Sequence, residues 1–289
     1  MTDVARLHDE IYADGFAAMP GVLPTAWADR LGEDVNRQLI AALEVEHGAG
    51  VAFRGWNRFY LELYPERISG FAELAEHVAI DGCCRRVLGD EYRIVELGAD
   101  VPLPGAPAQP PHRDFPMPEP TRLHGRLTSL AFNASCVDGT ADMGPFNIAP
   151  GSHFDPGDDF VSGMFPVGEQ RERYARAMVE RIARRGSVSV RSGLTLHRGT
   201  RNAGRMRQVV ILGVVSPEDR AHPDTAIALP ADYAPPTLKM SREYHDGLSE
   251  TLRRRLSCEI VCESPRELPP LETPHSIEGL VMGQAPEAP

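Results

Sequence analysis

The residues best suited to binding a metal ion are His112 and Asp114, which lie two positions apart. On a β-strand this spacing places both side chains on one face, so that one imidazole and one carboxylate can bind the same ion. A second imidazole from a distant strand, His197, would complete a set of two histidines and one carboxylate. Such a set covers one triangular face of an octahedral ion and leaves three positions open, an arrangement typical of non-haem iron(II) sites that react with oxygen.

The tripeptide alone is a weak signal, because a solvated histidine near a turn aspartate gives the same pattern. The prediction of a metal site therefore depends on the strands and helices around the tripeptide. Short apolar segments between glycine and proline turns predict strands over residues 16–23, 92–98, 127–137, 144–150, 187–191, 194–197 and 206–215. Helices are predicted over residues 7–12, 26–46, 71–88, 169–185 and 241–256, the last capped by Ser241. We expect a sandwich or jelly roll with helices packed outside, and a loop over 100–111 that leads into His112.

Length and composition suit one large domain, because 289 residues with 42% hydrophobic content can form a substantial core. The net charge of −11 and the lack of a basic run argue against nucleic acid as a partner. No apolar run reaches membrane length and no apolar signal core is visible near Met1, so we expect a cytoplasmic protein without a membrane partner. The odd number of cysteines indicates neither a disulfide framework nor a zinc site, although Cys258 and Cys262 could adjoin on a helical turn.

Five landmarks follow one another between residues 97 and 215. They are Pro104-Gly105 and Gln109 before His112-Arg113-Asp114; Asn133 eleven residues before Gly144; the turn Pro150-Gly151-Ser152-His153; Ser192-Gly193 before His197; and Asn202 followed by Arg207. In this order and spacing they resemble the phytanoyl-CoA dioxygenase-like (PhyH) family of Fe(II)/2-oxoglutarate-dependent oxygenases. The resemblance leaves the segment after Ser216 unexplained.

The resemblance implies a mainly β fold with flanking helices: the double-stranded β-helix, or jelly roll, of cupin-like barrels. It also implies that His112, Asp114 and His197 bind Fe(II), with 2-oxoglutarate and O2 as cosubstrates. Because Asp114 is present, a halogenase is disfavoured, since related halogenases replace that carboxylate with a small residue. One departure is Arg198, which stands where the family usually has glycine and could either influence the charge preference of the site or point outward.

The far carboxylate of 2-oxoglutarate needs a cation, and a guanidinium can hold it through two parallel hydrogen bonds. Arg207 stands where the family keeps this arginine, and an apolar strand begins just after it. Arg205, two residues away, is the competing residue. By the same resemblance, Gln109 and Asn133 are expected to form hydrogen bonds with the cosubstrate.

The expected reaction is oxidation, most simply hydroxylation, of an aliphatic C–H bond in a small molecule, with release of succinate and CO2. Desaturation, epoxidation, ring formation and epimerisation stay open, because the predicted metal ligands do not distinguish them. We expect the substrate to be a secondary metabolite or an amino-acid- or acyl-derived molecule. Residues predicted to line its pocket are Arg54, Trp56, Tyr60, Phe115 and Met117.

The expected organisation is one oxygenase domain over 1–289. It would comprise a core jelly roll at about 90–216, an N-terminal helical support at 1–89, and a C-terminal segment at 217–289 that forms a lid or a homodimer contact. Two other functions fit the metal triad or the fold. A metal-dependent hydrolase could use the same triad but would have no use for Arg207, and a non-catalytic jelly-roll binding protein would need neither metal nor cosubstrate.

Overall fold

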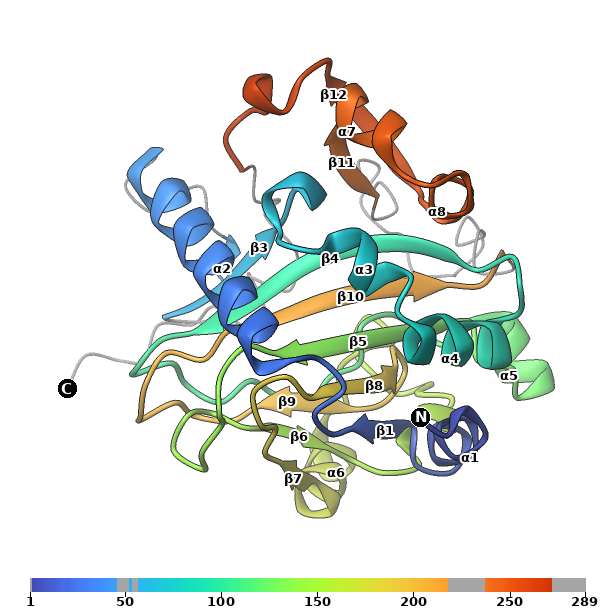
Figure 1. Ribbon diagram of the computed structural model, residues 1–289. Helices are drawn as coiled ribbons and strands as arrows, with labels where there is room; N and C mark the ends of the chain where they lie inside the picture. The colour runs from blue at the N-terminus through green and yellow to red at the C-terminus, as the bar shows by residue number, and fades with distance from the viewer. Residues whose placement is uncertain (1, 46–51, 54–56, 218–236, 272–289) are drawn as a thin grey trace.

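The structure, a computed structural model, describes residues 2–45, 52–53, 57–217 and 237–271. Two antiparallel sheets face each other across a cavity that residues of both sheets line (Figure 1). Within the described residues the large sheet has seven strands, in the order β1-β8-β5-β10-β4-β3-β2, and the small sheet has three, in the order β7-β6-β9. The strands of the large sheet are β1 (Phe16–Met19), β2 (Ala52–Phe53), β3 (Arg58–Glu62), β4 (Arg93–Pro102), β5 (Ser129–Ser135), β8 (Val188–Ser192) and β10 (Val209–Val215). Those of the small sheet are β6 (Phe146–Ile148), β7 (Val179–Arg181) and β9 (His197–Gly199). The predicted jelly roll is confirmed.

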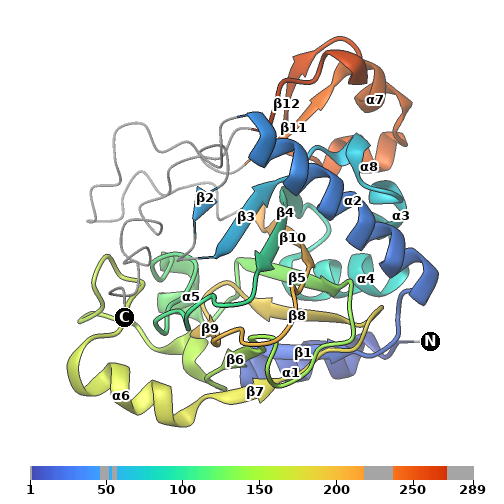
Figure 2. The same cartoon turned by 90° about the vertical axis from the view of Figure 1, so that its left-hand side faces the viewer.

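Alternation along the strands gives the large sheet two different faces. One face presents apolar side chains such as Leu97, Phe132 and Leu212 to the helices, where they join the main hydrophobic core. The opposite face presents polar side chains such as Asp100 and Asn133 to the cavity. Figure 2 shows α2 and α4 on the right of this sheet, and α5 and α6 on its left. The helices are α1 (Val4–Asp14), α2 (Thr25–Val45), α3 (Phe71–Ala75), α4 (Val78–Leu88), α5 (Glu119–His124) and α6 (Gly168–Ala177), with 3-10 turns η1 (Pro65–Arg67) and η2 (Ser152–Phe154).

Two of the predicted helices differ from the structure. The helix expected over 71–88 divides into α3 and α4, because the imidazole of His77 accepts a hydrogen bond from Ala79 N at 3.3 Å and so caps a new helix. The helix expected over 169–185 ends at Ala177 and is followed by β7, whose pairing with β6 overrides the local helical pattern. Sequence analysis did not predict β7, which borders the cavity.

The strands also differ from the prediction in places. The chain expected to form a loop from residue 100 continues as β4 to Pro102, because β3 and β10 both pair with it at Asp100. The strand predicted over 194–197 begins only at His197. The N-terminal segment is also more than a helical support, since β1, β2 and β3 belong to the large sheet. The helices α1, α2 and α4 pack against that sheet, and α3 packs against α4.

The C-terminal part of the described chain packs beside η1 and β4 (Figure 1). It contains a parallel pair, β11 (Leu238–Ser241) and β12 (Cys258–Cys262), with α7 (Arg242–Gly247), α8 (Glu250–Arg255) and η4 (Pro265–Glu267). Ser241 caps α7 as predicted, through a hydrogen bond from Tyr244 N. The single helix predicted over 241–256 is divided in two, however, because Ser249 caps α8. Cys258 and Cys262 lie on a strand, not a helical turn. The lid or dimer role of 217–289 stays a prediction, and residues 218–236 and 272–289 lie outside the described chain.

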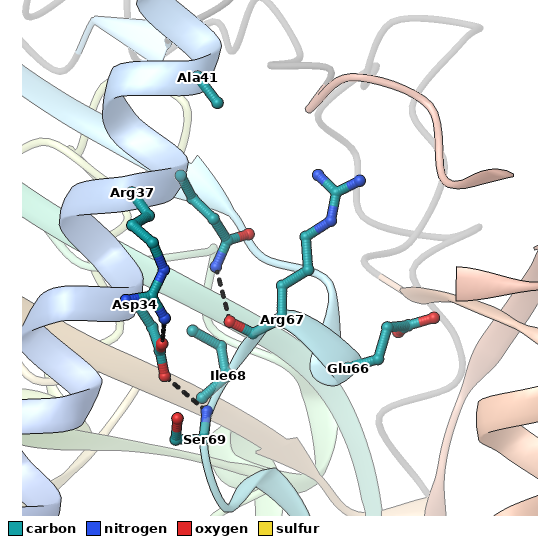
Figure 3. Close-up of a pocket in the computed structure, with 8 residues that line it drawn as sticks. Asp34, Arg37, Ala41, Glu66, Arg67, Ile68 and Ser69 are labelled. Atoms are coloured by element: carbon teal, nitrogen blue, oxygen red, sulfur yellow. Dashed lines mark hydrogen bonds and ion pairs between the residues drawn. The ribbon is translucent and has the colours of Figure 1, made fainter. Parts of the chain in front are cut away.

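A second cavity, of about 430 Å³, lies between α2 and η1 (Figure 3). Its polar groups largely bond to one another: the Asp34 carboxylate accepts from Ser69 N at 2.6 Å, and Gln38 Nε2 donates to Arg67 O at 3.3 Å. Its lining includes no residue of the predicted metal triad, whereas His112 and His197 line the cavity between the sheets. Across the described residues, no helix has the length and apolar character needed to span a membrane.

Candidate metal centre

His112, Asp114 and His197 converge at one end of the cavity between the sheets. His112 and His197 form an antiparallel bridge, in which each backbone N–H donates to the other's carbonyl, at 3.0 and 2.8 Å. Asp114 N donates to Gly193 O at 2.9 Å, in the turn between β8 and β9, which holds Asp114 close to His197. As a result, one potential ligand atom from each of the three side chains lies within 4.8 Å of the others. The structure therefore brings the predicted triad together.

Backbone carbonyls orient both imidazole rings. Nδ1 of His112 lies 2.9 Å from Pro110 O, and Nδ1 of His197 lies 2.8 Å from Thr195 O. Since a carbonyl only accepts hydrogen bonds, each Nδ1 carries the proton, and the lone pair of each ring is on Nε2. This outer hydrogen bond is the usual way in which a protein fixes a metal-binding histidine.

Electrostatics favours the protonation states that a metal needs. Burial lowers the pKa of His197 well below its usual value, and the charges of Arg191 and His112 lower it further, so the ring is neutral. Burial also acts to raise the pKa of Asp114, but Arg191 and His197 outweigh it and bring that pKa to about 2. At neutral pH the site thus offers a neutral imidazole beside an ionised carboxylate.

Arg191 is a residue of the site that sequence analysis missed. Both of its terminal nitrogens donate to the Asp114 carboxylate, one of them at 3.3 Å, and its side chain is buried. The alternation of Ser187, Ser189 and Arg191 with two valines in β8 was the available signal, because it places all three on the cavity face. Arg191 therefore holds the carboxylate in place before any ion binds.

The cavity extends from the triad between the sheets and has a volume of about 500 Å³. We call the part of its wall formed by Arg58, Asp100 and Arg207 the inner wall. Arg207 is buried there, with Nε donating to Met143 O at 3.3 Å and Nη2 lying 3.4 Å from Asp100 Oδ2. Burial lowers the pKa of Arg207 to about 10, and Asp100 opposes that shift, so the guanidinium remains charged at neutral pH. Arg205, the competing residue, is exposed.

Arg58 is a second arginine in the same wall, and sequence analysis did not single it out. Its Nε and Nη2 donate to Asp100 at 2.9 and 2.7 Å, and its side chain is almost fully buried. Gly199 lies so close that any Cβ there would overlap the guanidinium. Two buried guanidiniums thus share the Asp100 carboxylate, and Arg58 Nη1 is buried with no hydrogen-bond partner in the described structure. This end of the cavity is suited to an anion.

The two amide residues predicted to contact a cosubstrate have different surroundings. Asn133 lines the cavity from β5, and its Nδ2 is buried with no partner in the described part of the chain. The Gln109 side chain also lines the cavity, but its Oε1 accepts from Gly199 N at 2.9 Å and so supports β9. Asn133 therefore has a donor available for a ligand, whereas the Gln109 carbonyl is already used.

The remaining predictions fare less well. Of the residues expected to line a substrate pocket, Tyr60 bonds to Glu96, and neither it nor Phe115 or Met117 lines the cavity. Arg54 and Trp56 lie outside the described residues. Arg198 alternates with His197 on β9 and pairs with Asn147, so it faces away from the triad. As expected, His153 is not part of the triad: its ring is buried against Tyr12 O, 3.2 Å from Nε2.

The fold and the site together define a jelly-roll protein with a potential metal centre of two histidines and one carboxylate. The family model of phytanoyl-CoA dioxygenase (PhyH) matches residues 11–209, more than half of the chain, and the chain belongs to this family. Membership supports an oxygenase-type enzyme. No curated protein matches the sequence significantly.

Solved structures share the fold at low sequence identity. The epimerase SnoN, in complex with Fe3+, alpha ketoglutarate and nogalamycin RO, is 22% identical with a TM-score of 0.58, covering 81% of this chain and 92% of its own. SnoK, a non-heme alpha ketoglutarate dependent carbocyclase from nogalamycin biosynthesis, is 18% identical with a TM-score of 0.59, covering 74% and 86%. AviO1 from Streptomyces viridochromogenes is 20% identical with a TM-score of 0.56, covering 75% and 96%.

Proposed function

We propose that this chain is an Fe(II)- and 2-oxoglutarate-dependent oxygenase that oxidises an aliphatic C–H bond of a small molecule, in the simplest case by hydroxylation. The observation that carries the proposal is the meeting of His112, Asp114 and His197 within 4.8 Å, in a cavity whose inner wall has a surplus of positive charge. The triad suits Fe(II), and the charged wall suits a dicarboxylate. Family membership supports the same class of reaction.

The donor set fits iron(II). Two imidazoles that carry their lone pairs on Nε2, together with one ionised carboxylate, would leave Fe(II) with residual positive charge and exchangeable positions. Arg191 donates to both oxygens of the Asp114 carboxylate and would keep that carboxylate oriented when the ion binds. In this proposal the triad residues are the only protein ligands to the metal.

The inner wall fits 2-oxoglutarate. Arg207 would hold the far carboxylate, and the unpartnered Nη1 of Arg58 is a second donor that the same carboxylate could satisfy. The unpartnered Nδ2 of Asn133 is a third donor on the path between this wall and the triad. Each of these buried nitrogens would gain a hydrogen bond that the protein alone does not provide.

When bound, iron and 2-oxoglutarate would supply the oxidation of a C–H bond by O2, with release of succinate and CO2. The residues of the chain bind and orient these groups and exclude water. Val209 and Ile211 form an apolar patch on the cavity face of β10, and Phe146 lies 5.2 Å from the His197 ring, so the space around the triad is largely apolar. The names epimerase and carbocyclase of two proteins with this fold indicate that hydroxylation is one of several outcomes open to such a site.

Succinate formation provides the test. We expect the purified protein with Fe(II) and O2 to form succinate only when 2-oxoglutarate is added, and we expect Asp114→Ala to abolish it. An anaerobic titration of the Fe(II) protein with 2-oxoglutarate should give the weak visible charge-transfer band of the chelate. A metal-dependent hydrolase would show no need for 2-oxoglutarate, and a binding protein would be stabilised by neither ligand, so either result would overturn the proposal.

A further inference from the structure

The outer end of the cavity opens between the edges of the two sheets. β1 is the last strand of the large sheet and β7 is the last strand of the small one, and neither has a further neighbour among the described residues. The cavity lining continues from the triad to residues of both edge strands and of the segment that follows β7. Figures 1 and 2 show β1, the lowest strand of the large sheet, and β7 both in the lower part of the molecule. The cavity therefore extends from the triad to the gap between the two edge strands.

Arg181 bridges this opening. It lies opposite Phe146 in the register of β6 and β7, so both side chains face the cavity. Its guanidinium lies over the ring of Phe16 on the facing sheet, 5.1 Å from the ring centre. A cation stacked on an aromatic ring in this way keeps its edge free to donate hydrogen bonds to a ligand.

The charge of Arg181 is not balanced by the protein. Within the described residues it forms no ion pair, and its Nε is buried without a hydrogen-bond partner. Glu180 also borders the cavity, but it is exposed and lies opposite Asn147, on the other face of β7. Arg184, at the same mouth, adds a further positive charge. The other cavity arginines differ, because Arg58, Arg191 and Arg207 each contact a carboxylate.

We propose that Arg181 and Phe16 form the substrate-recognition subsite, and that the substrate is a small molecule with an anionic group and a ring or other apolar body. This inference rests on the proposed oxygenase function. Arg181 would hold the anionic group, while Phe16 and Phe146 contact the apolar body. Arg181 and His197 stand on strands separated by β6, two strand spacings or roughly 10 Å apart. In the strand register Arg181 is opposite Gly199, two residues or about 7 Å along β9 from His197, so the backbones of Arg181 and His197 are roughly 12 Å apart, with the oxidised carbon expected between the two side chains.

A matched pair of probes tests the subsite: 3-phenylpropanoate and its neutral amide, 3-phenylpropanamide. Binding is measured by calorimetry on anaerobic protein saturated with Fe(II) and 2-oxoglutarate, so that the acid cannot occupy the cosubstrate site. We expect wild-type protein to bind the acid about tenfold or more tightly than the amide, as a charge-assisted hydrogen bond would give. Arg181→Met should bring the ratio of the two affinities close to one, and Arg181→Lys should restore part of it.

Two further variants complete the test. Arg171→Met removes an exposed arginine of α6 and should keep the wild-type preference for the acid. Phe16→Leu should weaken the acid and the amide by the same factor. The inference is overturned if wild-type protein shows no preference for the acid, including by binding neither probe, or if Arg181→Met keeps the preference. Failure of the proposed function gives a different result, namely that 2-oxoglutarate does not bind. In that case the acid and amide are compared on the protein alone.

Discussion

Neighbouring residues of β10 illustrate the difference between the two faces of the large sheet. Leu212 is buried in the main core beneath the helices, whereas Ile211 faces the cavity. On β8 the same alternation separates Val190, in the core, from Arg191, which bonds to Asp114. The helix-covered face is almost wholly apolar, and the cavity face carries charged and amide side chains.

The cavity face also contains polar atoms that the protein leaves unsatisfied. Arg58 Nη1, Asn133 Nδ2 and Arg191 Nε are all buried without a hydrogen-bond partner in the described structure, as is Arg181 Nε on the small sheet opposite. Each such group lowers stability by an estimated 1–3 kcal/mol unless a ligand or water pairs with it. One face of the sheet therefore stabilises the fold, whereas the other carries buried polar groups that lower stability and are available to bind polar ligands.

Removal of a metal ligand should have the largest effect on the cavity face. His197→Ala deletes one of three proposed ligands, so we expect succinate formation to fall by roughly a hundredfold or more, since even an outer-shell partner can be worth that much. Fe(II) binding measured under anaerobic conditions should weaken in parallel, while the far-ultraviolet circular dichroism stays unchanged. His124→Ala, which alters an exposed histidine, is the control. Retained iron affinity in His197→Ala would remove this residue from the site.

The triad could be predicted because it depends on residue types at fixed spacings. His112 and Asp114 are two residues apart in the chain, and His197 follows a recognisable Ser-Gly turn, so sequence alone predicts that the three side chains meet. The overall jelly roll was predictable for a similar reason, because short apolar segments between turns carry a local signal.

The prediction missed residues whose role depends on which strands pair with one another. Arg58 and Asp100 come from strands paired in the fold but 42 residues apart in the chain, and nothing local marks either as part of the site. Arg181 lies in β7, which reads as helix in the sequence and becomes a strand only through its pairing with β6. At this strand, tertiary contacts override the local helical propensity. Because the strand was not predicted, the residues at the outer end of the cavity were not predicted either.

Truncation of a core residue should give the converse result. Leu212→Ala leaves a void beneath the helices and should lower the free energy of unfolding by about 2–5 kcal/mol. Succinate formation per folded molecule should be unchanged, because Leu212 does not line the cavity. Its neighbour Ile211→Ala removes the same number of carbons from the other face and should cost less, towards the lower end of about 2–5 kcal/mol, because Ile211 already borders the cavity. Urea unfolding checks both values, and equal losses in the two variants would contradict the division between the faces.

Loss of the proposed cosubstrate anchor should have a smaller and more selective effect. Arg207→Ala removes a charged donor from the inner wall, so we expect 2-oxoglutarate to bind roughly tenfold to a hundredfold more weakly. Metal affinity should change little, because Asp100 stays paired with Arg58 and the triad is untouched. Arg205→Ala, at an exposed position, should bind 2-oxoglutarate as wild-type protein does. The reverse outcome, with normal affinity in Arg207→Ala and a loss in Arg205→Ala, would transfer the role to Arg205.

The smallest expected effect concerns a buried histidine that serves the fold. Burial lowers the pKa of His153, although its hydrogen bond with Tyr12 and the charge of Asp14 oppose this, so the folded protein keeps the ring neutral. The unfolded chain protonates the same ring near its ordinary pKa of about 6.5, and the free energy of unfolding therefore falls as the pH drops below that value. His197 shifts in the same direction, but its contribution cancels when two proteins that both contain it are compared.

His153→Gln should consequently lose less stability than wild-type protein between pH 7.5 and pH 5.5, whatever its stability at pH 7.5. Urea unfolding of the metal-free proteins at both pH values measures the two differences. Identical differences would mean that the His153 ring can accept a proton within the folded structure, and that its buried position does not contribute to the acid sensitivity of the fold.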